Sequence, residues 1–573
     1  MVLIAERPVA GDTRPPAPLP RRPFSPERTA ATLTILALLG VSVASLISID
    51  ISIPSMLESW SNAERFFDRV GVVSFPPLGE LLYLTAFTVG LVLCGTLLAA
   101  VLSVPIAWIS ASNTTPGPAW RAFGRFVGVF TRAVPDVVLA MVFVLMFSLG
   151  SLPGILAIGI HSIGMISKMF ADAIEQVDDG PRLAIRATGG SKLQEFTSGV
   201  LPQVLPSWVA TVLHRNDINL RGSVILGYVG VAGLGAEMAN AFKSLNYSLG
   251  LGVAIVLFAL CVGMEIVSSV VRTAMLGTQP TGRGLGDRIV RRARGNRAVA
   301  TPVNRNSGDG VAAMLSRPWT PGRVRSVVWG WTAVAVVIGS ILICDIQWGD
   351  FLTLWGYLPS IAASFWPPSF GNYDATTLVL AMLQTVGIAL AATVLTLVLS
   401  LIIGSLAAKN VAPNGQVRGA MRLLLVIIRG VPEIILAIVL IVVTGLGTQA
   451  GTLALAFGGI GLLGKLLADS FEEVKAGPER AVTAAGATRL QVFAGATLPQ
   501  GTKALLGHSF YLLDTNIRAA TILGIVGGGG VGYYLLNAGQ GSKYDLVTSI
   551  VLMILVTVLV VEGIAMWMRR VFR

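Results

Sequence analysis

The chain has 573 residues, of which 54% are hydrophobic and only 13% are charged, and its formal net charge is +12. Soluble domains carry about a quarter charged residues, so this composition excludes a soluble globular protein. Apolar runs of about 20 residues or longer have the length of membrane-spanning helices, and the alternation typical of barrel strands is missing. We therefore expect an all-α integral membrane protein.

The N-terminal residues 1–29 are polar and rich in proline, which predicts a disordered tail and not a cleaved signal peptide. Two sets of six apolar segments follow, which predicts about twelve transmembrane helices. The first set lies near residues 30–49, 81–110, 126–149, 152–171, 204–236 and 248–271, and the second near 326–344, 378–407, 422–447, 450–468, 504–536 and 546–568. Between the sets, residues 275–325 hold ten arginines, two aspartates and no lysine, and form a predicted basic linker.

The second set is a copy of the first, displaced by 297 residues. This spacing pairs Arg132 with Arg429, Lys168 with Lys465, Gly189 with Gly486, Pro202 with Pro499 and Arg221 with Arg518. The match needs no gap between Thr88 and Arg272, which indicates duplication and fusion of one unit, with repeats at 30–274 and 326–573. Because each half has an even number of spans, we expect parallel repeats related by a pseudo-twofold axis.

The basic linker predicts the orientation of the chain, because cytoplasmic loops carry an excess of arginine and lysine. The segment 50–80 has five acidic residues against two arginines, which suits the opposite side. Counting spans from a cytoplasmic N-terminus then places the C-terminus and the polar segments 178–203 and 475–500 in the cytoplasm. This topology signal explains the linker better than nucleic-acid binding does, and no nucleic-acid partner is expected.

The segment 178–203 and its copy 475–500 are polar and lie between apolar spans. Pro181 starts a helix with an apolar side, Gly189 interrupts it, and Pro202 leads into the next span. This pattern predicts a short helix–turn–helix at the membrane surface, whose apolar face could dock into a groove on another protein. An ordinary interfacial helix is the alternative, and the repetition of the pattern favours docking.

This loop resembles the "EAA" coupling loop of ABC importer permeases, in which an alanine, a glycine and an apolar-Leu-Pro ending follow at set spacings. The flanking motifs are similar to those of the phosphonate-transporter permease, over about 185 residues of each half. They are "RAVPD" and "RGVPE", "SKMFADAIEQVDDGP" and "GKLLADSFEEVKAGP", and "NDINLRGSVILGYVGVAGLG" and "LDTNIRAATILGIVGGGGVG". The resemblance implies the type I importer permease fold. Most members of that family are single-repeat chains that pair as homodimers, whereas here both halves share one chain.

The resemblance also implies two ATPase subunits, which receive the coupling loops in the cytoplasm, and an external solute-binding protein. ATP and Mg²⁺ would be used by the ATPase subunits, and this chain would bind no cofactor. The residues expected to couple to the ATPase are Ala184, Gly189, Leu193 and Pro202 and their copies Ala481, Gly486, Leu490 and Pro499.

The glutamate that names the coupling loop would stand at positions 183 and 480, which hold leucine and arginine. Glu479 lies one place early, and its counterpart in the first half is Arg182. The role of the family's glutamate is therefore not carried over, and unequal contacts of the two loops with the ATPase stay open.

Arginines inside predicted spans are site candidates, because a charge at mid-bilayer costs roughly 2.5–3.5 kcal/mol on insertion scales and needs a partner or a cavity. The candidates for the substrate pathway are Asp217, Asn219 and Arg221 and their copies Asp514, Asn516 and Arg518. A guanidinium matches phosphate and phosphonate oxygens, and one arginine from each half would face a central pathway. The alternative is an ion pair with the aspartate four residues earlier that only stabilises the helix.

Two further pairs of cations are assigned a gating or structural role. Arg132 and Arg429 precede a proline that is expected to kink the span. Lys168 and Lys465 lie near the cytoplasmic end of a span, where a long side chain reaches the surface. The glycine clusters "GYVGVAGLG" and "GIVGGGGVG" predict a break or close helix packing, and a break would present backbone amides to an anion.

The sequence contains no recognisable enzyme site. Gly459 to Lys465 have the spacing of a phosphate loop, but Leu466 replaces the serine or threonine that binds Mg²⁺. The three cysteines have neither the spacing of a metal site nor that of a disulfide framework, and no metal site is expected.

We therefore expect the permease subunit of an ATP-driven importer in the bacterial plasma membrane, with no ATPase site of its own. Its substrate would be phosphonate or a related phosphorus oxyanion, namely phosphate, phosphite or a phosphate ester. The alternative is a stand-alone ion-coupled anion carrier or channel.

Overall fold

The computed structural model describes residues 26–49, 53–276, 319, 321–445 and 447–571. These residues form helices joined by short turns, and the described part contains one isolated β-bridge, between Gly150 and Val231. The prediction of an all-α protein is confirmed. Most of the predicted N-terminal tail and of the basic linker lies outside the described residues.

The helices of the two repeats follow the same order at the spacing that the sequence gives. The first repeat contains α1 (Pro26–Ser48), α2 (Ile53–Val70), α3 (Leu78–Ser110), α4 (Pro118–Ala133), α5 (Asp136–Phe147), α6 (Ser151–Glu175), α7 (Asp179–Ala187), α8 (Lys192–Gln194), α9 (Leu201–Leu226), α10 (Leu234–Lys243) and α11 (Tyr247–Leu276). The second contains α14 (Pro321–Ile343), α15 (Asp350–Phe365), α16 (Ala375–Ala407), α17 (Gly415–Gly430), α18 (Glu433–Thr444), α19 (Thr448–Glu472), α20 (Ala476–Ala484), α21 (Arg489–Val492), α22 (Leu498–Val526), α23 (Val531–Gln540) and α24 (Tyr544–Val571). Helices α3 to α7 recur as α16 to α20 with both bounds displaced by 297 residues, so the duplication extends to the structure.

Eight of the described helices are long and apolar enough to span a membrane, or up to eleven if each sharply bent pair counts as one span. The shorter apolar stretch Val327–Ile343 of α14 falls on the remaining one of the twelve predicted segments. Three predicted spans are broken helices and not straight ones. The bends are 85° between α4 and α5, 82° between α17 and α18, and 52° between α22 and α23.

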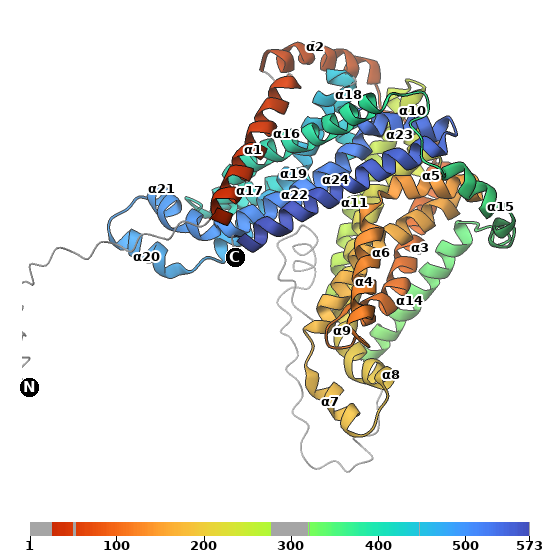
Figure 1. The fold of residues 1–573 in the computed structure, drawn as a ribbon, viewed down its shortest axis with the longest axis horizontal. Helices are drawn as coiled ribbons and strands as arrows, with labels where there is room; N and C mark the ends of the chain where they lie inside the picture. Colours follow the sequence, from red (N-terminus) through yellow and green to blue (C-terminus); the bar gives the residue numbers. More distant parts are fainter. Residues whose placement is uncertain (1–25, 50–52, 277–318, 320, 446, 572–573) are drawn as a thin grey trace, which may run out of the picture.

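The first helix of each repeat packs on the other repeat. Helix α1 packs against α16, and α14 packs against α3 (Figure 1). Glycines at equivalent positions permit both approaches, since a Cβ at Gly90 would lie 2.9 Å from Ile343 and one at Gly387 would lie 3.1 Å from Ser45. The repeats are contiguous in sequence but exchange these helices in space, and the exchange is reciprocal, as a twofold relation requires.

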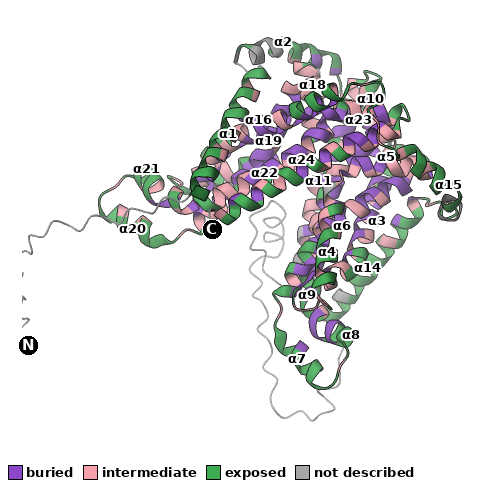
Figure 2. Ribbon diagram, viewed as in Figure 1, coloured by how far each residue is buried: buried purple, intermediate pink, exposed green. Residues whose placement is uncertain are grey.

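The two repeats lie together at one end of the molecule and diverge toward the end that carries α7 and α8 and α20 and α21 (Figure 1). We call this end the loop side. The largest cluster of buried apolar residues contains members of both repeats, such as Val137, Leu220, Ile434 and Ile517. Toward the loop side each repeat has clusters of its own, and the α7 and α20 regions are largely exposed (Figure 2). The repeats therefore share one core where they meet, and each has its own core toward the loop side.

Candidate functional site

A helix break in each repeat lies at the motif that contains proline. Helix α4 ends at Ala133 and α5 begins after Pro135, while Pro432 stands at the same place between α17 and α18. Proline lacks the N–H group that would continue the helix, and the last carbonyl oxygens of the preceding helix lose their intrahelical donors. The predicted kinks are confirmed, and they expose backbone acceptors next to Arg132 and Arg429.

The predicted pathway arginines reach these breaks across the interface between the repeats. Arg221 donates from Nη1 to the carbonyl oxygen of Arg429 at 2.7 Å, and Arg518 donates from Nη1 to the carbonyl oxygen of Arg132 at 3.4 Å. Because the two contacts are related by the repeat, each arginine joins its own α9 or α22 helix to the opposite copy. The side chains of Arg221 and Arg518 are 21% and 18% exposed, so both are partly buried at this interface.

Both arginines also form the predicted ion pair with the aspartate one turn earlier. The Nη2 atom of Arg221 lies 3.0 Å from the carboxylate of Asp217, and Arg518 pairs with Asp514 in the same way. The helix-stabilising alternative is therefore present, but it uses only part of each guanidinium. The same side chains form the cross-repeat contact, so the geometry combines a local pair with an interface role.

The predicted gating residue Arg132 forms a second contact between the repeats. Its Nη2 atom lies 2.9 Å from Glu562 of α24, with the two side chains 18% and 26% exposed. At the equivalent positions, Arg429 and Glu265, the described residues show no ion pair. Lys168 and Lys465 are exposed on α6 and α19. Of these two, Lys168 lines a cavity of about 270 Å³ that also contacts Arg132 and Glu562.

The two predicted asparagines do not join the arginines. Asn219 donates to the hydroxyl of Thr96 at 2.9 Å, and Asn516 donates to the hydroxyl of Thr393 at the same distance. Both asparagines are buried, and they connect α9 to α3 and α22 to α16 within their own repeats. In this conformation they support the helix that carries the arginine and do not reach the interface.

Arg215 is a charged residue of this region that the sequence analysis did not include. It lies on α9, and its Nε atom donates to the hydroxyl of Ser162 at 3.1 Å. The second repeat has Leu512 at the equivalent position, so this cation belongs to the first copy alone. The rule that selects charges within apolar spans identifies Arg215 as readily as Arg221. The candidates predicted from the sequence are all pairs shared by the two copies, and Arg215 has no such counterpart.

The glycine clusters show both predicted properties, a break and close packing. Gly230 has φ 99° and Gly527 has φ 113°, values that favour glycine, and they end the helices before α10 and α23. A Cβ on Gly227 would lie 2.1 Å from the backbone of Gly235 in α10. After each break, the first amide of the new helix donates a hydrogen bond to a threonine hydroxyl. Leu234 donates to Thr88 at 2.9 Å, and Val531 donates to Thr385 at 2.8 Å. These amides are therefore already bonded in this conformation.

The predicted helix–turn–helix is confirmed in both polar segments, which we call the first coupling segment (178–203) and the second coupling segment (475–500). Helix α7 ends at Ala187 and the chain turns at Gly189, with φ 82°, while α20 ends at Ala484 and the chain turns at Gly486, with φ 83°. The next short helix begins with a capping box in each copy, and a π-helical turn leads into α9 or α22. All eight predicted coupling residues are exposed, and the side chains that would dock include Leu193 at 60% and Leu490 at 76% exposed.

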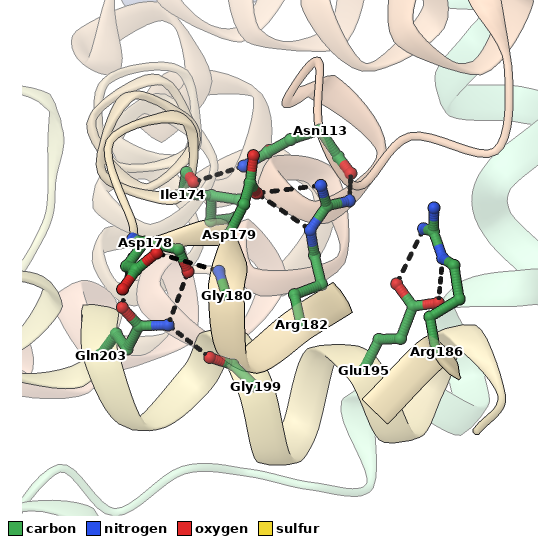
Figure 3. Close-up of polar contacts among 10 residues, drawn as sticks. All are labelled: Asn113, Ile174, Asp178, Asp179, Gly180, Arg182, Arg186, Glu195, Gly199 and Gln203. Carbon is green, nitrogen blue, oxygen red and sulfur yellow. Dashed lines mark hydrogen bonds and ion pairs between the residues drawn. The ribbon is translucent and has the colours of Figure 1, made fainter. Parts of the chain in front are cut away.

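The two coupling segments are held to the body by opposite charges. In the first, Arg182 is buried, pairs with Asp179 at 2.9 Å and donates to the carbonyl oxygen of Asn113 (Figure 3). In the second, the equivalent residue is Glu479, which accepts from the side chain of Asn410 at 2.7 Å. The glutamate that lies one place early thus binds within its own chain.

A further ion pair is present in the first coupling segment and not in the second. Arg186 binds both carboxylate oxygens of Glu195, at 2.8 and 2.9 Å (Figure 3). The second segment has Thr483 and Val492 at these positions. The backbone path is therefore shared, while the charges that stabilise it are not.

Comparison with known proteins agrees with this architecture. The profile of the family described as "Binding-protein-dependent transport system inner membrane component" matches residues 103–276 and 400–573, two stretches separated by the same 297 residues. The chain is 40% identical over 477 residues to the phosphate-import permease protein PhnE of Mycolicibacterium smegmatis, which covers 83% of this chain and 82% of that one. It is 36% identical over 185 residues to the phosphite transport system permease protein PtxC of Stutzerimonas stutzeri, which covers 32% of this chain and 67% of that one.

Two matches to one family confirm the repeat, and the long match to an import permease confirms the resemblance drawn from the motifs. The helical architecture, with its paired breaks and exposed coupling segments, has the features expected of that family. The chain belongs to the family of binding-protein-dependent transport system inner membrane components, and it carries two copies of the family's unit.

Proposed function

We propose that this chain is the transmembrane permease subunit of an ATP-driven importer for phosphonate or a related phosphorus oxyanion. The observation that carries this proposal is the reciprocal contact in which Arg221 and Arg518 each reach the helix break of the opposite repeat. It brings one guanidinium from each copy to the interface, and guanidinium groups match phosphate-type oxygens. Relatives named for phosphate import and phosphite transport support the same substrate class.

The partners follow from the two coupling segments. One ATPase subunit would bind each segment and hydrolyse ATP with Mg²⁺, while a solute-binding protein would deliver substrate on the opposite side. We assign the loop side and both chain termini to the cytoplasm of the bacterial plasma membrane, because the arginine-rich linker favours that side. In this arrangement the chain itself carries out no hydrolysis.

Motion of the coupling segments would change the interface between the repeats. The repeats share a core at one end and diverge at the loop side, so drawing the two segments together rotates one repeat against the other (Figure 1). The cross-repeat contacts of Arg221 and Arg518 lie between these bodies and would break and re-form during the rotation. Exposed Leu193 and Leu490 give each ATPase an apolar contact through which to apply the force.

The arginine contacts would allow an oxyanion both to bind and to leave. In this conformation each guanidinium donates to a neutral carbonyl oxygen of the other repeat. An oxyanion that passes between the repeats would compete for these donors, because a charged acceptor forms the stronger hydrogen bond. Asp217 and Asp514 bind the same arginines and would limit the affinity, so that the anion is released.

The test is uptake of radiolabelled phosphate and of a phosphonate into proteoliposomes that contain the chain, candidate ATPase subunits and a candidate solute-binding protein from the same organism. We expect uptake with ATP and none with a non-hydrolysable analogue. An ATPase that carries an inactivating substitution is the matched control. Uptake by the chain alone without nucleotide would overturn the proposal in favour of an ion-coupled carrier or a channel.

A further inference from the structure

A cavity of about 520 Å³ lies between α22 and α24 on the loop side of the second repeat. Its lining includes Lys503, Gly507 and Phe510 from α22, and Met566, Arg569 and Arg570 from α24. Three of the described lining residues are basic and none is acidic. Three exposed cations around one hollow give it a positive potential, which attracts anions.

The cavity lies in line with the interface contacts described above. On α22, Lys503, Gly507 and Phe510 share one helix face with Asp514, since they follow at spacings of four, three and four residues. On α24, Met566 and Arg570 lie one and two turns beyond Glu562. At about 1.5 Å per residue, the cavity begins at Phe510, roughly 6 Å along α22 from Asp514 toward the loop side.

The basic residues of the cavity are not all repeated in the sequence of the first copy. At the equivalent positions of the first repeat, Lys503 is replaced by Pro206 and Arg570 by Thr273. Only the third cation has a basic counterpart, because Arg272 stands opposite Arg569. The transmembrane arginines are shared by the copies, whereas this basic cluster is not.

We propose that this cavity binds a phosphate-type oxyanion through Lys503, Arg569 and Arg570. Two guanidinium groups from α24 and one ammonium group from α22 supply several hydrogen-bond donors around the hollow. Such donors suit tetrahedral oxyanions. The anion comes either from substrate that leaves the pathway or from the headgroup of an anionic lipid in the adjacent leaflet. The chemistry of the site stands on these residues, and its place at the release end of the pathway rests on the proposed function.

The experiment uses the full chain in phosphatidylcholine nanodiscs and measures binding of radiolabelled inorganic phosphate. We expect the K503Q/R569Q/R570Q variant to bind phosphate roughly tenfold more weakly than the parent, or worse. The linker variant R283Q/R288Q/R291Q removes the same charge from the basic linker, and we expect it to bind as the parent does. A second arm uses nanodiscs that contain phosphatidylglycerol and measures retention of that lipid by mass spectrometry.

The two arms identify the source of the anion. Weaker phosphate binding in phosphatidylcholine assigns the site to free oxyanion, and loss of retained phosphatidylglycerol without a phosphate effect assigns it to lipid. Parent-like behaviour of the triple variant in both arms, or an equal loss in the linker variant, would overturn the proposal. If the triple variant does not fold, R570T restores the residue of the first copy and takes its place. The binding result stands even if nucleotide-driven uptake fails, so the two proposals fail separately.

Discussion

The first and second coupling segments follow the same backbone path, but different charges hold them to the body. The first uses buried Arg182 with Asp179 and adds the pair between Arg186 and Glu195, whereas the second uses Glu479 with Asn410. Near the interface the opposite holds, because Arg221 and Arg518 form the same contacts in both copies. The two copies therefore share the arginine contacts at the interface and differ in the charges that hold the coupling segments.

The largest effect should come from the shared arginines, where the two copies are equivalent. We expect the double variant R221Q/R518Q to lower nucleotide-driven uptake on the order of 100-fold, because it removes both cross-repeat donors. Each single variant should have a similar, smaller effect. The measurement is initial uptake into proteoliposomes at saturating ATP.

Each arginine substitution leaves a partly buried carboxylate without its cation, which destabilises the fold. The paired variants D217N/R221Q and D514N/R518Q remove that charge and serve as controls for folding. Unchanged uptake in R221Q/R518Q would take the arginines out of the pathway, and very unequal single variants would show that the copies differ here as well.

The next effect concerns the exposed leucines that would enter the ATPase. We expect L193E and L490E each to lower ATP-driven uptake roughly tenfold, because a charge in an apolar contact disrupts the centre of an interface. The measurement is uptake together with co-purification of the ATPase. Equal losses would mean that both copies dock in the same way despite their different charges. A loss with only one of the two variants would show that a single segment transmits the force.

A smaller effect should follow exchange of the reversed charges. R182E places a buried carboxylate beside Asp179 and a carbonyl oxygen, whereas E479R removes the acceptor of the Asn410 amide and places a guanidinium near Ala476, where the first copy has Asp179. We expect R182E to destabilise its segment by about 1–3 kcal/mol and E479R by less. Hydrogen exchange in α7 and α20 of the full chain measures the difference. The reverse order would mean that Asp179 contributes little to holding the first segment.

The smallest effect should come from the pair between Arg186 and Glu195. The arginine is 53% exposed, so solvent screens the interaction and we expect only a weak coupling in a double-mutant cycle. The coupling should fall as salt rises. The measurement is protection of the first coupling segment from proteolysis, with T483A in the second segment as the matched control. A coupling that does not respond to salt would contradict this account.

The fold could be predicted well wherever the sequences of the two repeats could be compared at equivalent positions. The matched prolines that follow Arg132 and Arg429 predicted the helix breaks, and the matched glycines Gly189 and Gly486 predicted the turns of the coupling segments. Prolines and glycines act through their own backbone chemistry, so their effect does not depend on knowing which helices are neighbours.

The exchange of α1 and α14 could not be predicted. Both helices are apolar on nearly all sides, and in lipid an apolar surface does not identify its partner, because lipid and helix are similar in polarity. The amphipathic helix α2 and the short apolar helix α15 were not predicted either, because neither is an apolar run long enough to span a membrane.

The candidate site was predicted in part. Arg221 and Arg518 were found from their charge, but the direction of Asn219 depends on a hydroxyl at Thr96, which is distant in sequence. Arg215 has no copy in the second repeat, so comparison of the repeats concealed it. A repeat identifies what the halves share, and it gives no signal for a residue that one half acquired alone.

The exchanged helices also determine how the polypeptide assembles. Until α14 has been inserted, the groove around Gly90 on α3 faces lipid, and α1 has no surface on which to rest until α16 follows. The first half is therefore incomplete when its last helix, α11, leaves the ribosome, whereas the second half can receive α1, which is made first. After a protease cut within the linker, the two fragments would stay associated through the exchanged helices. Fragments made separately would have to exchange α1 and α14 before either could complete its fold.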